Sequence, residues 1–247
     1  MLSYLLATNR PIEWAKKTVD SIQSLKPHDY EIIICSPNED IQKLTNERVK
    51  YVFDDVNFSS NYAFNKCFDN CSGDWVTLVT DDHTTHLDVD RLFSVMYSEE
   101  MQKQKYQILN LGDWWGISLG HTFNQDPGWY NEIGVNIIAP EVYTRLHNYR
   151  YPVITFPCIS SKTIREQFKG VVFHPKIIHH YVDHWMGIYT TLKDPNIPFT
   201  LYGKSSIWDI HTHQNNCITK HDPVDRRVFL EIATRALVTP IESLTYI

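Results

Sequence analysis

The sequence predicts an α/β protein whose central sheet is mixed, mainly parallel and flanked by helices. Three observations lead to this fold class. Short apolar runs alternate along the chain with segments of helical periodicity. The runs are nearly continuous in their apolar character, which is typical of strands that are buried on both faces. Polar residues follow the ends of these runs, where ligands bind in sheets of this kind.

The N-terminal part of the chain carries this pattern most clearly. Residues 3–7 form the first expected strand, and Pro11 is well placed for the first turn of a helix that extends to about Leu25. Three elements are expected after it: a strand at 30–36, a short helix at 38–46 and a strand at 49–53.

A further helix and strand are expected next. Tyr62, Cys67 and Cys71 recur at spacings that suit a helix, and Gly73 stands where the C-terminal glycine of that helix would belong. The apolar run DWVTLVT, residues 74–80, then predicts a strand.

The composition changes in the rest of the chain, where a stretch between residues 107 and 146 is rich in Trp, Gly and Asn. The elements expected around it are a helix near 88–103, a helix over 174–194, strands within 198–203 and 205–214, and a closing helix at 223–237. Because no repeat, low-complexity tract or Gly/Ser linker interrupts the chain, residues 1–247 are expected to form a single domain.

The composition narrows the class of protein. A chain of 247 residues that is 43% hydrophobic can bury a sizeable core. Its formal net charge of -6 gives no basic footprint, so a dedicated nucleic-acid binder is not expected. The N-terminus has no positively charged leader, and no segment approaches the ~20 apolar residues of a membrane span, so a cytoplasmic protein without an integral membrane segment is expected. The five cysteines are odd in number and scattered, which disfavours a disulfide framework.

Asp81 and Asp82 stand directly after the strand expected at 74–80. Two adjacent carboxylates repel each other unless a cation or a proton intervenes. An acidic, solvated loop is one explanation. The position after an apolar strand, at the ligand edge of the sheet, favours another: hard oxygens that hold Mg²⁺ or Mn²⁺, which in turn holds phosphate oxygens.

The segment from Asn65 to Asp82, N-x7-GDWVTLVTDD, resembles the core signature of the GT-A glycosyltransferases. In that signature an Asn-bearing helix leads through A-x-G-[DE]-[YW] into a strand that ends in the acidic DXD motif. Here the motif stands as Thr80-Asp81-Asp82, a variant also found in spore-coat polysaccharide glycosyltransferases of the family. The opening LLATNRP…AKKTVDSIQSL…YEIIICS is similar to the family's first two strands and intervening helix. The resemblance covers about the first ninety residues, and only fragments of it continue downstream.

The resemblance implies a GT-A (Rossmann-like) fold and a metal-dependent enzyme that moves a sugar from a nucleotide-diphosphate donor, with a UDP-sugar favoured, to a glycan or glycoconjugate hydroxyl. Residues 1–103 would be the nucleotide-binding half and 104–247 the acceptor-binding half. Asp82 would bridge the metal, Mn²⁺ or Mg²⁺, and Asp81 would face the ribose or a metal-bound water. The other nucleotide-binding residues implied are Thr8, Asn9, Arg10, Ser36 and Asn65.

Two departures from the family pattern leave the identity of the nucleotide undetermined. The acidic residue that commonly reads uracil after the second strand is replaced within Cys35-Ser36-Pro37. The Arg or Lys commonly found a few residues before the helix Asn is absent from FSSNYAFN.

Asp183 lies in HHYVDHWMG, which resembles the family's E-D-x-[DE]-[LMW] segment, where a carboxylate at a helix start acts as general base. Such a group is needed because the acceptor hydroxyl must lose its proton as it attacks the anomeric carbon. With Asp183 as base the reaction would be inverting, although retention stays open, as does a plain solvated helix acid. Asp113 is the competing base or sugar ligand.

His211 and His213 alternate along IWDIHTHQ, so both would point to one face of a strand. In many GT-A enzymes a late His completes the metal shell, and His211 fits this role better because it follows the apolar run directly. Exposed polar strand residues are the alternative. Trp114 and Trp115, beside Asp113, suit packing against the apolar face of a sugar, with core packing as the alternative.

Two other classes of function compete with the glycosyltransferase hypothesis. A phosphohydrolase with an aspartate nucleophile would need D-x-D-x-[TV], but DDHTT puts His83 where the second acid should stand. The other is a non-catalytic sugar- or nucleotide-binding module that kept the fold and lost the base. Substitution of Asp183 should abolish sugar transfer in an enzyme and have little effect in such a module.

Overall fold

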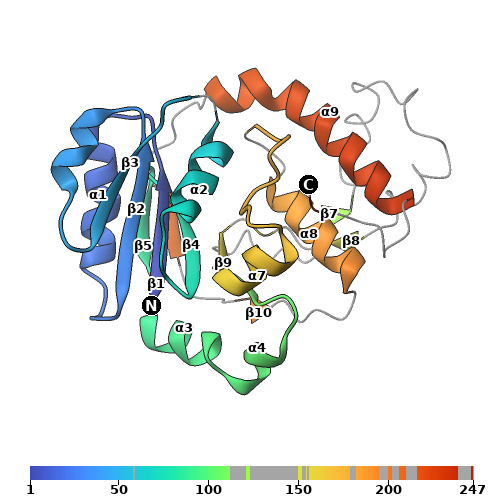
Figure 1. Ribbon diagram of the computed structural model, residues 1–247, viewed down its shortest axis with the longest axis horizontal. Coiled ribbons are helices and arrows are strands. Elements are labelled where there is room, and N and C mark those ends of the chain that lie inside the picture. The colour runs from blue at the N-terminus through green and yellow to red at the C-terminus, as the bar shows by residue number, and fades with distance from the viewer. Residues whose placement is uncertain are drawn as a thin grey trace.

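The computed structural model describes residues 1–57, 59–111, 121–122, 150–151, 154, 156–178, 182–194, 200–201, 206–209, 216–238 and 246. The fold class predicted from the sequence is confirmed: a mixed, mostly parallel sheet lies between layers of helices (Figure 1). No helix in the described part of the chain is long and apolar enough to cross a membrane.

The main sheet has seven strands within the described residues, in the order β10-β6-β9-β4-β1-β2-β3. Strand β9 runs antiparallel to its neighbours β4 and β6, and the other pairings are parallel. The strands from the second half of the chain thus extend the sheet beyond β4. Their bounds are β1 (Leu2–Ala7), β2 (Tyr30–Ser36), β3 (Val49–Phe53), β4 (Trp75–Thr80), β6 (Ile108–Asn110), β9 (Pro157–Ser160) and β10 (Thr200–Leu201).

Two short antiparallel pairs accompany the main sheet: β5 (His83–His86) with β11 (Ser206–Asp209), and β7 (His121–Thr122) with β8 (Arg150–Tyr151). The described helices are α1 (Ile12–Gln23), the 3-10 helix η1 (Glu39–Leu44), α2 (Ser60–Asp69), α3 (Val89–Met96), α4 (Glu99–Lys103), α7 (Ser161–Gln167), α8 (Val182–Lys193) and α9 (Asn216–Val238).

The central strands bury both of their faces. Successive side chains of β1 belong to two separate cores: Leu5 lies in the core that includes α2, α7, α8 and α9, whereas Tyr4 and Leu6 lie in the core that includes α1 and α3. This two-sided burial explains why the strands read as continuous apolar runs.

Two predicted helices have different bounds in the structure. The helix expected near 88–103 is split into α3 and α4, because Ser98 adopts an extended backbone and caps α4 by accepting the N–H of Met101 at 3.2 Å. The helix expected from residue 174 begins at Val182. In the segment before α8, backbone groups form hydrogen bonds with side chains of other helices. Asp225 of α9, for example, accepts the N–H of Ile178 at 2.8 Å.

Gly73 corrects another expectation. Helix α2 ends at Asp69 with Asn70 as its C-cap, so Gly73 is not the C-terminal glycine of that helix. A Cβ at Gly73 would lie 2.3 Å from Ser3 Oγ and 2.8 Å from Ser3 N. Glycine is therefore required because the turn before β4 approaches β1 closely.

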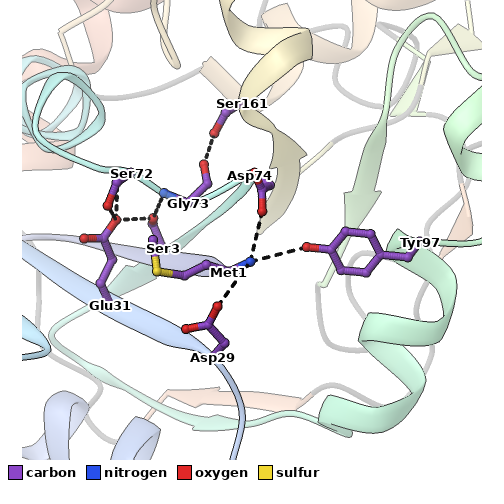
Figure 2. Close-up of polar contacts among 9 residues, drawn as sticks. All are labelled: Met1, Ser3, Asp29, Glu31, Ser72, Gly73, Asp74, Tyr97 and Ser161. Atoms are coloured by element: carbon purple, nitrogen blue, oxygen red, sulfur yellow. Dashed lines mark hydrogen bonds and ion pairs between the residues drawn. The ribbon is translucent and has the colours of Figure 1, made fainter.

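A buried carboxylate, Glu31, ties this turn to the sheet (Figure 2). Its Oε1 accepts hydrogen bonds from Ser3 Oγ at 2.7 Å and from the backbone N–H of Ser72 at 2.5 Å. Its Oε2 pairs with Lys50 Nζ at 2.6 Å. Ser3 Oγ in turn accepts the N–H of Gly73 at 2.9 Å. The start of β4 is thus fixed against β1 and β2 by one connected set of hydrogen bonds.

Burial alone would raise the pKa of Glu31, but the hydrogen bonds from Lys50, Ser72 and Ser3 outweigh it and lower the pKa from 4.5 to about 2. A carboxylate with a lowered pKa in the folded state stabilises the protein above its unfolded pKa. That contribution is lost as the pH falls from about 4.5 to about 2.

We predict that Glu31→Gln lowers the free energy of unfolding at pH 7 by roughly 3 kcal/mol and that this deficit shrinks below pH 4. Urea denaturation of both proteins between pH 7 and pH 2.5 measures it. Glu13→Gln, at an exposed glutamate of α1, is the control. A deficit that does not change with pH would contradict the assignment.

Candidate active site

The ends of three parallel strands coincide. Ala7, the last residue of β1, pairs with Cys35 of β2 and with Thr80 of β4. The segments that follow these strands therefore meet at one edge of the sheet. Most of the predicted nucleotide and metal residues lie at this edge: Ser36 is the last residue of β2, and the following segments carry Thr8, Asn9, Arg10, Asp81 and Asp82.

Asp81 is the buried member of the acid pair, with 8% of the residue exposed. The Thr8 hydroxyl donates a hydrogen bond to Asp81 Oδ2. The same Thr8 oxygen accepts the backbone N–H of Arg10 at 3.1 Å. Thr8 therefore joins the end of β1 to the end of β4.

Arg10 lies against both carboxylates. Its Nη1 is 3.3 Å from Asp81 Oδ1, and its Nη2 is 3.6 Å from Asp82 Oδ2. The guanidinium stacks over the Trp14 ring at 4.6 Å from the centroid, and Asn38 Nδ2 donates to the Arg10 carbonyl at 3.3 Å. The repulsion within the acid pair is thus offset by a cation from the chain itself.

The electrostatic environment differs between the two acids. Burial raises the pKa of Asp81; the Thr8 hydrogen bond and the Arg10 charge oppose this, while the Asp82 charge adds to it, and the net pKa is raised. The Asp82 side chain is more accessible, at 25% against 10% for Asp81. Asp82 is therefore the better placed of the two to meet a ligand.

Ser36 lies beside β3 at the same edge, and all of the residue is buried. Its carbonyl accepts the N–H of Asp54 at 2.9 Å, and its hydroxyl accepts the N–H of Asn38 at 3.1 Å. Asp54 is itself buried, and Oδ1 accepts the N–H of Asn57 at 2.9 Å. Asp54 was not among the predicted site residues, although it directly follows a strand, as Asp81 does.

Asn65 has a different environment from the one implied by the resemblance. Its Oδ1 accepts the N–H groups of Val172 and Phe173 at 2.8 and 3.0 Å, and its Nδ2 donates to the Phe173 carbonyl at 3.0 Å. These bonds use Oδ1 and one of the two N–H groups of Nδ2, and a contact between Asn65 and the nucleotide stays a prediction. In the structure Asn65 positions the chain between α7 and α8.

The residues predicted to complete the metal shell and the acceptor site are His211, His213, Asp113, Trp114 and Trp115, and all of them lie outside the described residues. Within the described part, no three His, Cys, Asp or Glu side chains form a metal-binding group. Strand β11 runs toward the acid pair, because its last residue, Asp209, pairs with His83.

Asp183 lies in the first turn of α8, as the resemblance implies for a base at a helix start. Its Oδ1 accepts the N–H of His184 at 2.9 Å, and its carbonyl accepts the N–H of Ile154 at 3.4 Å. The side chain is partly exposed, so it is open to solvent and to a ligand.

The sheet topology and the acid pair at its ligand edge define the class of this protein as the GT-A fold, in agreement with the resemblance drawn from the sequence. Residues 5–100 match glycosyl transferase family 2, a range that contains Glu31, the acid pair and Arg10. The match covers less than half of the chain, so the N-terminal region is similar to glycosyl transferase family 2. A search of curated proteins finds no match.

Solved structures share the fold at low sequence identity. TarS 1-349 of S. aureus has a TM-score of 0.53 and 9% identity, over 96% of this chain and 70% of that one. The same protein in complex with UDP has a TM-score of 0.51 and 11% identity, over 83% and 59%. Glucosyl-3-phosphoglycerate synthase from Mycobacterium tuberculosis, in complex with Mn²⁺, UDP and phosphoglyceric acid, has a TM-score of 0.57 and 13% identity, over 95% and 78%. The chain thus spans part of each of these proteins.

We predict that Thr8→Val lowers the free energy of unfolding by about 1–3 kcal/mol, because Asp81 and the Arg10 N–H both lose a buried partner. Thr8→Ser keeps the hydroxyl and is the matched control. Urea denaturation measures the difference, and equal stability of the Val and Ser variants would contradict this role of Thr8.

Proposed function

We propose that this protein is a metal-dependent glycosyltransferase that moves a sugar from a UDP-sugar to a hydroxyl of a glycan or glycoconjugate, with inversion. The observation that carries the proposal is the pair Asp81 and Asp82 at the joined ends of β1 and β4, inside the region that matches glycosyl transferase family 2. The preference for UDP rests on two neighbours of the same fold, TarS and glucosyl-3-phosphoglycerate synthase, whose structures contain UDP.

The donor groups fit a divalent cation. Carboxylate oxygens are the ligands that Mg²⁺ and Mn²⁺ prefer, and Asp82 offers one at a partly exposed position. When bound, such an ion would supply a Lewis acid for the departing diphosphate. The synthase neighbour contains Mn²⁺ together with UDP.

We assign the remaining metal ligand to His211, with His213 as the alternative. The pairing of Asp209 with His83 brings β11 to the residue after Asp82. His211 follows Asp209 by two residues in the sequence, and this short separation supports the assignment.

Asp183 is proposed as the base. A carboxylate within ~3 Å of the acceptor hydroxyl would take its proton as the hydroxyl attacks the anomeric carbon. The place of Asp183 in the first turn of α8 and its partial exposure support this role. Asp113, Trp114 and Trp115 are proposed to contact the sugars, with Asp113 as the alternative base.

Calorimetric titration with UDP and with GDP, each with and without Mn²⁺, tests the donor site. Asp82→Ala should weaken Mn²⁺-dependent UDP binding by about 10- to 100-fold, which corresponds to the loss of a charge-assisted contact. Asp20→Ala, at an exposed acid of α1 paired with Lys16, is the control. Failure of the wild-type protein to bind either nucleotide under any of these conditions would contradict the proposal.

Asp183→Asn should lower the turnover number for sugar transfer by about 10²- to 10⁴-fold, because the acceptor loses its general base. The affinity for UDP with Mn²⁺ should not change. UDP release from UDP-sugars in the presence of glycan acceptors measures turnover, and Asp194→Asn at the other end of α8 is the control. A variant as active as the wild type would remove Asp183 from this role and favour Asp113.

A further inference from the structure

Hydrogen bonds fix the backbone of Arg10 on both sides of its Cα. Its backbone N–H donates to Thr8 Oγ1 at 3.1 Å, and its carbonyl accepts from Asn38 Nδ2 at 3.3 Å. The guanidinium stacks on the Trp14 ring, and only 23% of the side chain is exposed. The position of this charge is therefore determined by contacts that do not involve the acid pair.

The ion pairs of Arg10, in contrast, are long. Charge-assisted N–H···O bonds are typically about 2.7–2.9 Å, whereas the Arg10 distances are 3.3 Å to Asp81 and 3.6 Å to Asp82. Nη1 is buried, and among the described residues no acceptor meets hydrogen-bond geometry with it. The guanidinium thus offsets the charge of the carboxylates without binding them through directed hydrogen bonds.

We propose that Arg10 is the counter-cation of the acid pair in the absence of metal. On metal binding, Asp82 exchanges its ion pair with Arg10 for one with a divalent cation. Arg10 is then a positioning residue that sets how tightly the site holds metal. The inference rests on the proposed function, because it takes Asp82 as the carboxylate that meets the ion.

The exchange follows from charge. Asp81 and Asp82 together carry two negative charges, and Arg10 leaves a net charge of about one on this cluster. A divalent ion at Asp82 would approach a guanidinium that Trp14 holds in place. At a separation of about 6 Å in a water-like dielectric, the repulsion between these charges lowers the affinity for the ion about tenfold.

The geometry also indicates which of the two acids exchanges its partner. Asp81 is held by both Thr8 and Arg10, so it keeps a partner when Arg10 loses Asp82. Asp82 is the more exposed and has the longer distance to the guanidinium. The exchange therefore takes place at Asp82 and leaves the buried carboxylate in place.

The test is Mn²⁺ binding to nucleotide-free protein, measured from the free-Mn²⁺ electron paramagnetic resonance signal. Arg10→Met keeps an unbranched chain over Trp14 and should bind Mn²⁺ about tenfold more tightly than the wild type. Arg10→Lys keeps the charge and should differ little from the wild type. Arg48→Met is the matched control, because Arg48 also stacks on an aromatic ring, Tyr30, at 5.0 Å, and should leave the affinity unchanged.

An unchanged or weaker Mn²⁺ affinity in Arg10→Met would overturn the inference, and so would the absence of Mn²⁺ binding in both this variant and the wild type. In wild-type protein, the Arg10 Nε–H NMR signal should shift on addition of Mg²⁺, a readout that does not depend on a variant that folds. UDP titration in parallel tests the proposed function by itself: Mn²⁺-dependent UDP binding by the wild type supports that function even where the role of Arg10 fails.

Discussion

The parallel register of β1 with β2 and β4 is the constraint on which the site depends. Because the three strands end together, the polar segments that follow them meet at one edge. A slip of one residue along β1 would exchange its two faces, moving Leu5 out of one core and Tyr4 and Leu6 out of the other. The burial of both faces therefore specifies the site as well as the sheet.

Two polar networks hold β1 at its ends. At the start, Ser3 joins the Glu31 carboxylate to the turn before β4. At the end, Thr8 joins the Asp81 carboxylate to the backbone of Arg10. Each network uses one hydroxyl, from Ser3 within β1 or from Thr8 directly after it, and one buried carboxylate of a neighbouring segment. The first network sets where β4 begins, and the second sets where its acidic end lies.

The sequence predicted those parts of the fold that depend on local pattern. The bounds of β2 and β3 agree with the structure because apolar runs and turn residues delimit them. The start of α8 could not be predicted, because the backbone N–H of Ile178 donates a hydrogen bond to Asp225, which lies far along the chain.

The site shows the same division. The acid pair was recognised from its position after a strand. The pairing of Arg10 with both acids was not, because it depends on how two strand ends meet in space. The hydrogen bonds of Asn65 to Val172 and Phe173 are equally remote in sequence. Gly73 was noticed for the wrong reason, since the atom that excludes a side chain there belongs to Ser3.

The central claim is that a divalent cation at the edge of the sheet links Asp82 to the diphosphate of a nucleotide. A crystal structure of the protein soaked with UDP and Mn²⁺, with the metal located by its anomalous scattering, tests it most directly. We expect a manganese peak about 2.0–2.6 Å from an Asp82 oxygen and in contact with the diphosphate. A nucleotide bound without metal at Asp82, or at another part of the molecule, would contradict it.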